Sequence, residues 1–410
     1  MKDKNAVLSD VIKGYRGVSY KPWQLKSTVD NDTAILLRSN NIKDGRLNFN
    51  DVQYVPKSIV DENQTLKKGD LVVCMSNGSK DLVGKNATFN LDSNFTFTIG
   101  AFCSVFKPKA GATIEYVRHL FSDNNYQKHI DLILAGSAIN NLRNTQIEEL
   151  KCYIPDYPIQ QKIAKILSTI DGQIEKTEGI IAKYQAVKQG MLQDLFTRGI
   201  DVTTGELRPK YEDAPELYKN SPLGMIPKEW KVVRLYDTVT VLDSMRIPIK
   251  QEDRDFMQKV YPYYGASGII DHVNDYLFDD ELILLGEDGE NVISRNLPLA
   301  FIVKGKIWVN NHAHVFKPNG ELIIELLVEQ LEKFNYSTYV SGSAQPKITQ
   351  DHLKKISVFV PHKIEQNRII DSISSTNKTI EDEQMVLDKL YKLKQGLMSD
   401  LLSGKVEVKI

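Results

Sequence analysis

The residue types that could carry out chemistry are scattered along this 410-residue chain, and they form no catalytic motif. The chain has no GxxxxGK[ST] phosphate loop, no GxGxxG after a strand, and no Pro-Pro dipeptide of the kind that amino-methyltransferases use. Glu149-Leu150-Lys151 and Glu229-Trp230-Lys231 match the E-x-K half of a nuclease metal site, but neither has a suitably placed Asp. The sequence therefore predicts a chain that is not an enzyme.

Metal and disulfide chemistry is also weakly supported. His312 and His314 lie two residues apart, so on a strand they would share one face and could bind a metal as a pair. No cysteine or carboxylate cluster accompanies them in the sequence, which favours histidines that lie on the surface or form hydrogen bonds. Cys74, Cys103 and Cys152 are few and far apart, so no disulfide framework is indicated. We expect no metal and no cofactor.

Side chains that suit DNA are frequent in the first third of the chain. Basic residues interleave with aromatic ones near the start, which suits contact with phosphates, sugars and bases: Arg16, Tyr20 and Lys21. A polar turn then follows an apolar strand, and Arg and Asn side chains can read guanine and adenine: Arg38, Ser39, Asn40 and Asn41. A solvated loop and a capped turn are the respective alternative interpretations.

Two further groups recur or lie in the second half. Gly136-Ser137-Ala138 recurs as Gly342-Ser343-Ala344, and polar residues follow each copy, so we predict DNA contacts at Ser137, Asn140, Asn141, Arg143, Ser343, Gln345 and Lys347. The second half adds an aromatic turn and several polar loops, whose candidates are Arg246, Lys250, Tyr263, Tyr264, Ser267, Arg295, Asn310, Asn311 and His312.

The elements that must position these residues follow from one internal repeat. Gly136–Leu195 recurs without a gap 206 positions later as Gly342–Leu401. Within it, Pro155 recurs as Pro361, Gln160 as Gln366, and Lys188-Gln189-Gly190 as a second Lys-Gln-Gly. The apolar positions match throughout, which is what a shared fold selects.

The second part of each copy is predicted to be one long helix. Apolar residues recur at alternating three- and four-residue steps over about five heptads, the spacing of a coiled coil. The first seam is Ile163, Leu167, Ile170, Ile174, Ile181, Tyr184, Met191 and Leu195, and the second is Ile369, Ile373, Ile380, Leu387, Leu390, Leu397 and Leu401. Gly199 and Gly404 are expected to stop the two helices. Because each stripe has a partner in the same chain, an intramolecular pair is favoured over a homodimer.

Ahead of each helix lies a longer stretch of mixed β and α character. Strands are expected at Ala34–Leu37, Leu71–Met75, Phe95–Ile99, Leu282–Leu285, Ala300–Val303 and Ile307–Val309. Two landmarks correspond loosely between the stretches: Ile42–Gly45 with Ile269–Asp271, and Phe106-Lys107-Pro108 with Phe316-Lys317-Pro318. The predicted organisation is a first domain (1–152), a central helix (153–199), a polar linker (200–220), a second domain (221–358), a distal helix (359–404) and a tail (405–410).

Charge and composition fit such a protein without identifying its ligand. The net charge is −1, but residues 1–150 carry 19 Lys and Arg against 16 Asp and Glu, and residues 201–350 carry 16 against 23. A DNA surface would therefore be a local patch. No apolar run approaches 18 residues and the N-terminus has no apolar signal region, so we expect a cytoplasmic chain without a membrane span.

The chain resembles the specificity (S) subunits of type I restriction–modification systems over nearly its whole length. The most specific matches are Ile154-Pro155 with Gln160-Gln161-Lys162-Ile163-Ala164, Val360-Pro361 with Glu365-Gln366, both Lys-Gln-Gly motifs, Phe196–Asp201, Ser221-Pro222-Leu223-Gly224, Ile226–Trp230, Tyr263–Gly268, Gly286–Gly289 and Asn310–His314. The two domains differ from each other in how they begin. The motif Ile226–Trp230 precedes Leu235 at the start of the second domain, whereas no similar motif precedes the equivalent Leu8 in the first.

The resemblance implies a non-catalytic reader of double-stranded DNA. Two target-recognition domains, each reading half of a split sequence, would be held apart by an antiparallel helix pair. That pair would fix the spacer and dock two methyltransferase (M) subunits, which motor-nuclease (R) subunits join. The alternatives are a stand-alone DNA-binding protein with this fold and a coiled-coil scaffold without methyltransferase partners.

Overall fold

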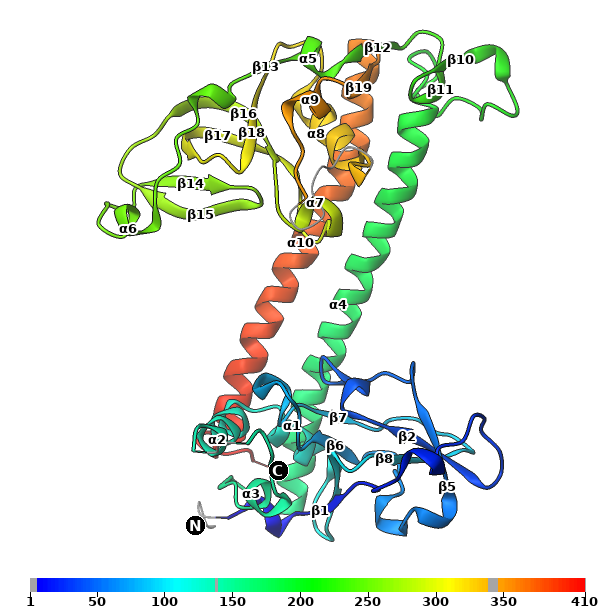
Figure 1. Ribbon diagram of the computed structural model, residues 1–410, viewed down its shortest axis with the longest axis vertical. Helices are drawn as coiled ribbons and strands as arrows, with labels where there is room; N and C mark the ends of the chain where they lie inside the picture. Colours follow the sequence, from blue (N-terminus) through cyan, green and yellow to red (C-terminus); the bar gives the residue numbers. More distant parts are fainter. Residues whose placement is uncertain (1–5, 137–138, 338–345, 410) are drawn as a thin grey trace. The chain divides into compact units, whose positions relative to one another are not determined.

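The structure is a computed structural model that describes residues 6–136, 139–337 and 346–409, and the chain divides into two units. Unit 1 comprises Met1–Ile180 and Glu383–Ile410, and unit 2 comprises Ile181–Asp382. Each unit contains one mixed α/β domain and one part of each of the two long helices (Figure 1). The predicted α+β organisation, with two domains and two long helices, is confirmed.

Unit 1 folds around an antiparallel sheet of strand order β1-β9-β6-β7, beside a second sheet of order β5-β2-β8 and a short hairpin β3-β4. Its strands are β1 (Ile12–Arg16), β2 (Thr33–Leu37), β3 (Ile42–Lys43), β4 (Arg46–Leu47), β5 (Gln53–Pro56), β6 (Leu71–Cys74), β7 (Asn86–Thr88), β8 (Thr96–Ile99) and β9 (Cys103–Pro108). Its shorter helices are α1 (Ile114–Phe121), α2 (Asn124–Ala135) and α3 (Asn144–Glu148).

Unit 2 has one larger sheet of order β13-β18-β16-β17-β14-β15 and two strand pairs, β10-β11 and β12-β19. Its strands are β10 (Tyr218–Ser221), β11 (Gly224–Pro227), β12 (Lys231–Arg234), β13 (Val239–Val241), β14 (Tyr261–Gly265), β15 (Gly268–Val273), β16 (Phe278–Gly286), β17 (Ala300–Val309), β18 (Ala313–Pro318) and β19 (Ser357–Val360). Its shorter helices are α5 (Leu235–Thr238), α6 (Gln251–Arg254), α7 (Asn291–Ser294), α8 (Ile324–Lys333) and α9 (Gln350–Leu353).

Four strands of each main sheet correspond. The orders β1-β9-β6-β7 and β13-β18-β16-β17 have the same antiparallel pairings. The predicted landmark Phe106-Lys107-Pro108 ends β9 and Phe316-Lys317-Pro318 ends β18, and their prolines pair with Ile12 and Val239 in the first strand of each sheet. The two domains therefore share a frame, to which unit 1 adds a separate sheet and unit 2 adds β14 and β15.

Two expectations about strands were wrong. Ile42–Gly45 forms β3 and the turn of the hairpin β3-β4, whereas Ile269–Asp271 lies inside the extended strand β15, so these stretches do not correspond. Ala300–Val303 and Ile307–Val309 are one strand, β17, which pairs with β16 on both sides of Gly305. The polar Lys304-Gly305-Lys306 interrupts the apolar pattern, but the pairing with β16 continues across it.

The long helices are α4 (Tyr157–Thr197) and α10 (Lys363–Leu401), of 41 and 39 residues. At a rise of about 1.5 Å per residue, each is roughly 60 Å long. Both end just before a glycine with a left-handed backbone, Gly199 at φ +63° and Gly404 at φ +66°. The predicted helix stops are confirmed. At Gly199 a side chain is also excluded, because a Cβ would lie 2.2 Å from a carboxylate oxygen of Glu365.

The two long helices run antiparallel in both units. In unit 1, Lys394 Nζ lies 2.7 Å from Asp171 Oδ1, and the hydroxyl of Tyr391 donates to Glu178 Oε1 at 2.7 Å. In unit 2, the start of α10 around Ile369 packs in the same core as the end of α4. Seam residues lie on the buried side of both helices, at Ile163, Leu167, Ile174, Ile181, Leu195, Ile369, Ile373, Leu387 and Leu401.

One repeated glutamine joins each domain to its long helix. Gln160 Oε1 accepts from the backbone N–H of Thr113 at 3.1 Å, and its amide donates to the carbonyl of Pro155 at 2.9 Å. Gln366 makes the same two contacts, with the N–H of Ile323 at 2.8 Å and the carbonyl of the proline before α10 at 3.0 Å. Thr113 and Ile323 are the N-cap residues of α1 and α8, so the repeat preserves the attachment of a helix in each domain.

The segment predicted as a linker is ordered against unit 2. Arg208 makes two hydrogen bonds to the buried carboxylate of Glu365, at 2.5 and 3.1 Å. The same carboxylate accepts from the indole N–H of Trp230 at 3.0 Å and from the backbone N–H of Ile200 at 2.9 Å. The residue 206 positions before Glu365 is the apolar Ile159, so this ion pair is a feature of unit 2 alone.

Within the described residues, no helix has the length and apolar character needed to cross a membrane.

Candidate nucleic-acid interface

The described residues after the repeated Gly-Ser-Ala motif, 139–142 in unit 1 and 346–348 in unit 2, are called the recurring segment. In unit 1 this segment is held beside the end of β6. The N–H of Leu142 donates to the carbonyl of Met75 at 2.7 Å, and Asn141 forms a β-bridge with Ser76. Leu142 is buried while Asn141 is exposed. The predicted contact Ser137 lies outside the described residues. An apolar residue therefore fixes the segment, and its polar neighbour faces solvent.

Unit 2 repeats this backbone arrangement at the same offset of 206 residues. The N–H of Ile348 donates to the carbonyl of Glu287 at 2.8 Å, and Lys347 forms a β-bridge with Asp288. Ile348 is buried and Lys347 is exposed, as in unit 1. Two other predicted contacts lie outside the described residues, Ser343 and Gln345.

In unit 1, Arg16 lies beneath the segment that contains Asn141 and Leu142. Its guanidinium donates to the carbonyls of Ala101 at 2.6 Å and Leu142 at 3.0 Å, and to Asn141 Oδ1 at 3.2 Å. These three bonds direct the group into the domain. The structure therefore places Arg16 as a support for the segment.

The predicted turn at Arg38 is closed by Asp51. The Asp51 carboxylate accepts from the Arg38 guanidinium at 3.0 Å and from the Asn40 amide at 2.9 Å. Asn41 is buried, with 1% of its surface exposed, and its amide donates to two backbone carbonyls of the same loop. Asn41 caps the turn, which is the alternative interpretation of this motif, while Asn40 remains exposed.

The same turn adjoins the recurring segment. The Asn77 amide donates to the hydroxyl of Ser39 at 3.5 Å, and the N–H of Asn77 donates to the carbonyl of Asn140 at 3.3 Å. Two groups that were predicted separately therefore form one surface in unit 1, joined by a residue that was not predicted.

Tyr20 and Lys21 lie at another edge of the domain. The hydroxyl of Tyr20 donates to Gln53 in β5 at 2.6 Å, and the amine of Lys21 lies 4.9 Å from the ring centre of the exposed Trp23. Arg143 is exposed at the start of α3, next to the recurring segment.

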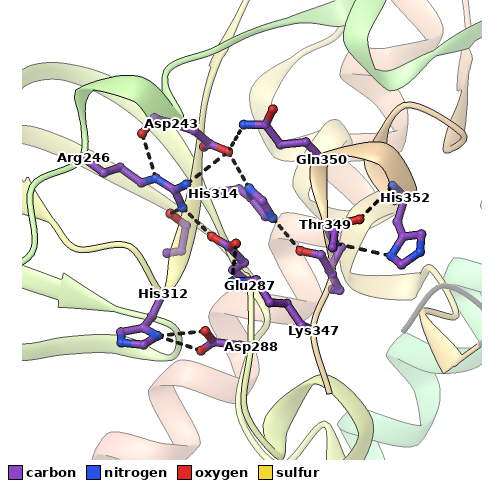
Figure 2. Close-up of polar contacts among 12 residues, drawn as sticks. Asp243, Arg246, Glu287, Asp288, His312, His314, Lys347, Thr349, Gln350 and His352 are labelled. Atoms are coloured by element: carbon purple, nitrogen blue, oxygen red, sulfur yellow. Dashed lines mark hydrogen bonds and ion pairs between the residues drawn. The ribbon is translucent and has the colours of Figure 1, made fainter. Parts of the chain in front are cut away.

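In unit 2 a buried network lies under the recurring segment (Figure 2). Asp243 and His314 are 7% and 1% exposed, and His314 Nδ1 lies 2.6 Å from Asp243 Oδ2. The other ring nitrogen of His314 lies 2.9 Å from the carbonyl of Ile348. Gln350 donates to the same Asp243 oxygen at 2.7 Å. The two ring nitrogens of His314 therefore face the Asp243 carboxylate and the Ile348 carbonyl.

Basic side chains surround the two acidic groups of this network. Arg246 donates to Glu287 Oε2 at 2.6 Å, and Lys347 Nζ lies 3.0 Å from Glu287 Oε1. Burial acts to raise the pKa of Glu287, but the bond from Arg246 and nearby positive charges hold it below its usual value. Asp243 is similar, since the bond and charge of His314 outweigh burial and lower its pKa. Both carboxylates are therefore charged at neutral pH, and Arg246 is held inside the domain.

The two histidines considered as a metal pair have different partners. His312 lies in the turn between β17 and β18 and is exposed, with Nδ1 at 2.9 Å from both carboxylate oxygens of Asp288. His314 is buried in β18 against Asp243. Across the described ranges, no three His, Cys, Asp or Glu side chains are grouped so that they could hold a metal ion.

The remaining predicted residues of unit 2 divide into buried and exposed ones. Tyr263 and Asn310 are 1% and 4% exposed and bond within the domain, so they support the surface and cannot lie on it. Tyr264 is half-buried against Phe301. Arg295 is paired with the carboxylate of Glu332 at 3.1 Å. Three others are exposed: Lys250, Ser267 and Asn311.

Sequence reasoning missed the residues that hold the surface from within. Asp243 carried no signal, because a lone Asp in a β/turn stretch is common. His314 was noted only as a metal candidate, and Asn77 was not among the predicted contacts. Their contacts join positions far apart in the chain, for instance 71 residues between Asp243 and His314. Spacing along the sequence could not indicate such contacts.

The fold and these surfaces define a class of protein: a duplicated α+β chain in which each domain carries a similarly built polar surface and is attached to a common pair of antiparallel helices. The chain belongs to the family described as type I restriction modification DNA specificity domain, whose profile matches residues 21–185 and 227–391. The two matches start 206 residues apart, the offset of the internal repeat.

Several specificity subunits are similar to this chain. It is 30% identical over 198 residues to the type I restriction enzyme StySPI specificity subunit of Salmonella potsdam, covering 48% of this chain and 42% of that one. It is 33% identical over 184 residues to the EcoKI specificity subunit of Escherichia coli, covering 45% and 39%. The chain thus spans about two fifths of each. The MjaVIII specificity subunit of Methanocaldococcus jannaschii is 26% identical over 305 residues, which is 67% of this chain and 66% of that one.

A solved structure supports the fold. The crystal structure of a type I restriction–modification S subunit from M. genitalium has a TM-score of 0.56 with 14% identity, over 99% of this chain and 96% of that one.

Proposed function

We propose that this chain is a non-catalytic DNA reader of a type I restriction–modification system and that each unit contacts one half of a split target. The observation that carries the proposal is the repeated scaffold with different side chains. Leu142 and Ile348 are held by equivalent backbone bonds, but the exposed neighbour is Asn141 in one unit and Lys347 in the other. Equal scaffolds with unequal side chains suit two readers of different sequences.

The residues proposed to touch DNA are the exposed ones of the predicted set. They are Lys21, Asn40, Asn141 and Arg143 in unit 1 and Lys250, Ser267, Asn311, His312 and Lys347 in unit 2. Arg and Lys can bind guanine or phosphate, while Asn can bind adenine. The buried members of the set would hold these side chains in place.

The long helices are proposed to set the spacer and to dock methyltransferase subunits, which motor-nuclease subunits then join. The chain has a net charge of −1 and would bind DNA weakly alone. Partner subunits would add phosphate contacts and enclose the duplex. Co-purification with cognate methyltransferase subunits tests this part, and a chain that binds its target DNA fully without them would instead be a stand-alone reader.

Arg143→Ala tests the reading surface. If Arg143 contacts a base or phosphate, the loss should weaken binding of target DNA by about 1–3 kcal/mol. The measurement is a titration of the complex with target duplex at fixed salt. Lys128→Ala, an exposed substitution on α2, is the matched control and should change affinity little. Equal affinities for both variants would contradict the assignment of this surface.

A further inference from the structure

The supports beneath the recurring segment occupy corresponding positions in the two units, although their residue types differ. The N–H of Leu8 donates to the carbonyl of Leu150 at 2.9 Å, and the N–H of Leu235 donates to that of Ile356, also at 2.9 Å. Leu150 and Ile356 are 206 residues apart, so Leu8 and Leu235 are equivalent starts. Counting eight residues onward from each reaches Arg16 in unit 1 and Asp243 in unit 2.

The neighbouring strand supplies a second equivalent pair. Arg16 is the register partner of Ser104 in β9. In unit 2, the last registered pair of β13 and β18 is Val241 with Phe316, and two residues further on Asp243 contacts His314. Ser104 and His314 both lie four residues before the proline that ends their strand. They are therefore equivalent.

A third equivalent pair lies just after the recurring segment. Asn144 and Gln350 are 206 residues apart and begin α3 and α9. Asn144 accepts from the hydroxyl of Ser104 at 2.7 Å, whereas Gln350 donates to Asp243 at 2.7 Å. Each unit thus has three residues at the same positions, joined in different ways: Arg16, Ser104 and Asn144 in unit 1, and Asp243, His314 and Gln350 in unit 2.

The two sets of three residues both place a side-chain nitrogen beside the same backbone carbonyl of the repeat. In unit 1, Arg16 donates to the carbonyl of Leu142 at 3.0 Å. In unit 2, Asp243 stands at the position that corresponds to Arg16, and its carboxylate cannot donate a hydrogen bond. The nitrogen that faces the equivalent carbonyl is instead His314 Nε2, which lies 2.9 Å from the carbonyl of Ile348. Leu142 and Ile348 are the same position of the repeat. In each unit a side-chain nitrogen therefore lies within hydrogen-bond distance of this carbonyl and holds the segment in place.

We infer that Arg16 and His314, which lie at different positions of the shared frame, are positioning residues with the same role: each fixes the recurring segment of its unit for DNA reading. The part of this inference that concerns DNA reading rests on the proposed function, whereas the part that concerns anchoring of the segment rests on geometry. Both side chains lie beneath the segment and act through it. Each should therefore govern one half of the target without touching it.

Hydrogen exchange in the full chain tests the anchoring. Arg16→Gln should speed exchange of the Leu142 amide about tenfold or more and leave the Ile348 amide unchanged, and His314→Gln should do the reverse. Lys13→Gln and Lys317→Gln lie on the same strands, with side chains that are 54% and 52% exposed, and are the matched controls. Unchanged exchange in the two anchor variants would overturn the inference. Should either variant fail to fold, the milder substitutions Arg16→Lys and Asp243→Asn replace them. Each should give a smaller increase in the exchange rate, at the Leu142 amide and the Ile348 amide respectively.

Selection from a random duplex pool, with the chain in complex with cognate methyltransferase subunits, tests the link to reading. Arg16→Gln should relax the bases selected in one half of the motif, and His314→Gln those in the other half. A role in stability alone would weaken both halves together and would overturn the inference, as would a motif left intact despite faster exchange. If the wild-type complex selects no motif, the proposed function fails, whereas the exchange result still decides the anchoring.

Discussion

His119 is a buried titratable residue whose surroundings predict a pH effect in unit 1. Its side chain is 1% exposed, and its Nε2 lies 3.3 Å from the hydroxyl of Ser168. Burial and then the charge of Arg118 lower the pKa of His119 to about 4, and Asp171 offsets this only in part. His119 is therefore neutral in the folded chain at physiological pH.

The sign of the effect follows from proton binding. Between a pKa of about 6.5 in the unfolded chain and about 4 in the folded chain, only the unfolded chain takes up this proton. Stability should therefore fall as the pH drops through this window. His119→Gln should remove roughly 3 kcal/mol of this loss, as measured by denaturant unfolding at pH 7 and pH 4. His272→Gln, at an exposed site, is the control. Identical pH profiles for wild type and His119→Gln would contradict the assignment.

The repeated glutamines give a second prediction for single residues. Gln160→Met and Gln366→Met each leave buried backbone groups without a partner, which costs about 1–3 kcal/mol per group. Thermal unfolding should show a lowered midpoint for both variants. Gln161→Met, at the exposed neighbour, should change stability by less than about 0.5 kcal/mol. If the three variants are equally stable, these hydrogen bonds are not the attachment of the domains.

At the scale of elements, the ion pair of Arg208 and Glu365 fixes the segment between the domains to unit 2. Glu365→Ile places the residue type of Ile159 at the equivalent position but removes the two hydrogen bonds that the buried Arg208 makes to this carboxylate. Breaking a buried pair in this way typically costs about 3–5 kcal/mol. Adding Arg208→Leu should recover most of that loss in a double-mutant cycle followed by chemical unfolding.

The control for this cycle is an exposed ion pair. Asp351→Asn removes the partner of Lys354 at the surface and should cost less than about 1 kcal/mol. An additive cycle, in which Arg208→Leu restores nothing, would show that the two side chains do not act together.

The long helices and their attachments could be predicted because the repeat conserves local signals. Heptad spacing, the stopping glycines and the recurrence of Gln160 as Gln366 all lie at one offset of 206. The strand β17 was divided in error, since periodicity reports which faces are apolar and not where pairing ends. The apolar pattern therefore predicted an element correctly where one face of that element is buried along its whole length.

The residues that support the candidate interface could not be predicted, for a physical reason. Arg16 and Asp243 are 227 residues apart, while Leu142 and Ile348 are 206 apart, so no single offset aligns them. Their residue types also have opposite charge. Only the strand register shows that they occupy one position, and that register depends on pairings between distant parts of the chain.

At the scale of the whole molecule, the duplication preserves attachment and varies the surface. The bonds of Gln160 and Gln366 are the same, as are the backbone bonds of Leu142 and Ile348. The residues exposed beside them differ, as do the sheets that each unit adds to the shared frame. Two readers for two different half-targets would be built in this way.

The most direct test of that account is to map methylated bases in the DNA of cells that carry this gene with its cognate methyltransferase gene. The account predicts a motif in two fixed halves separated by a spacer of constant length and free sequence. Replacing residues 1–152 by the corresponding domain of a relative should change one half only. A single continuous motif, or a change in both halves after that replacement, would contradict it.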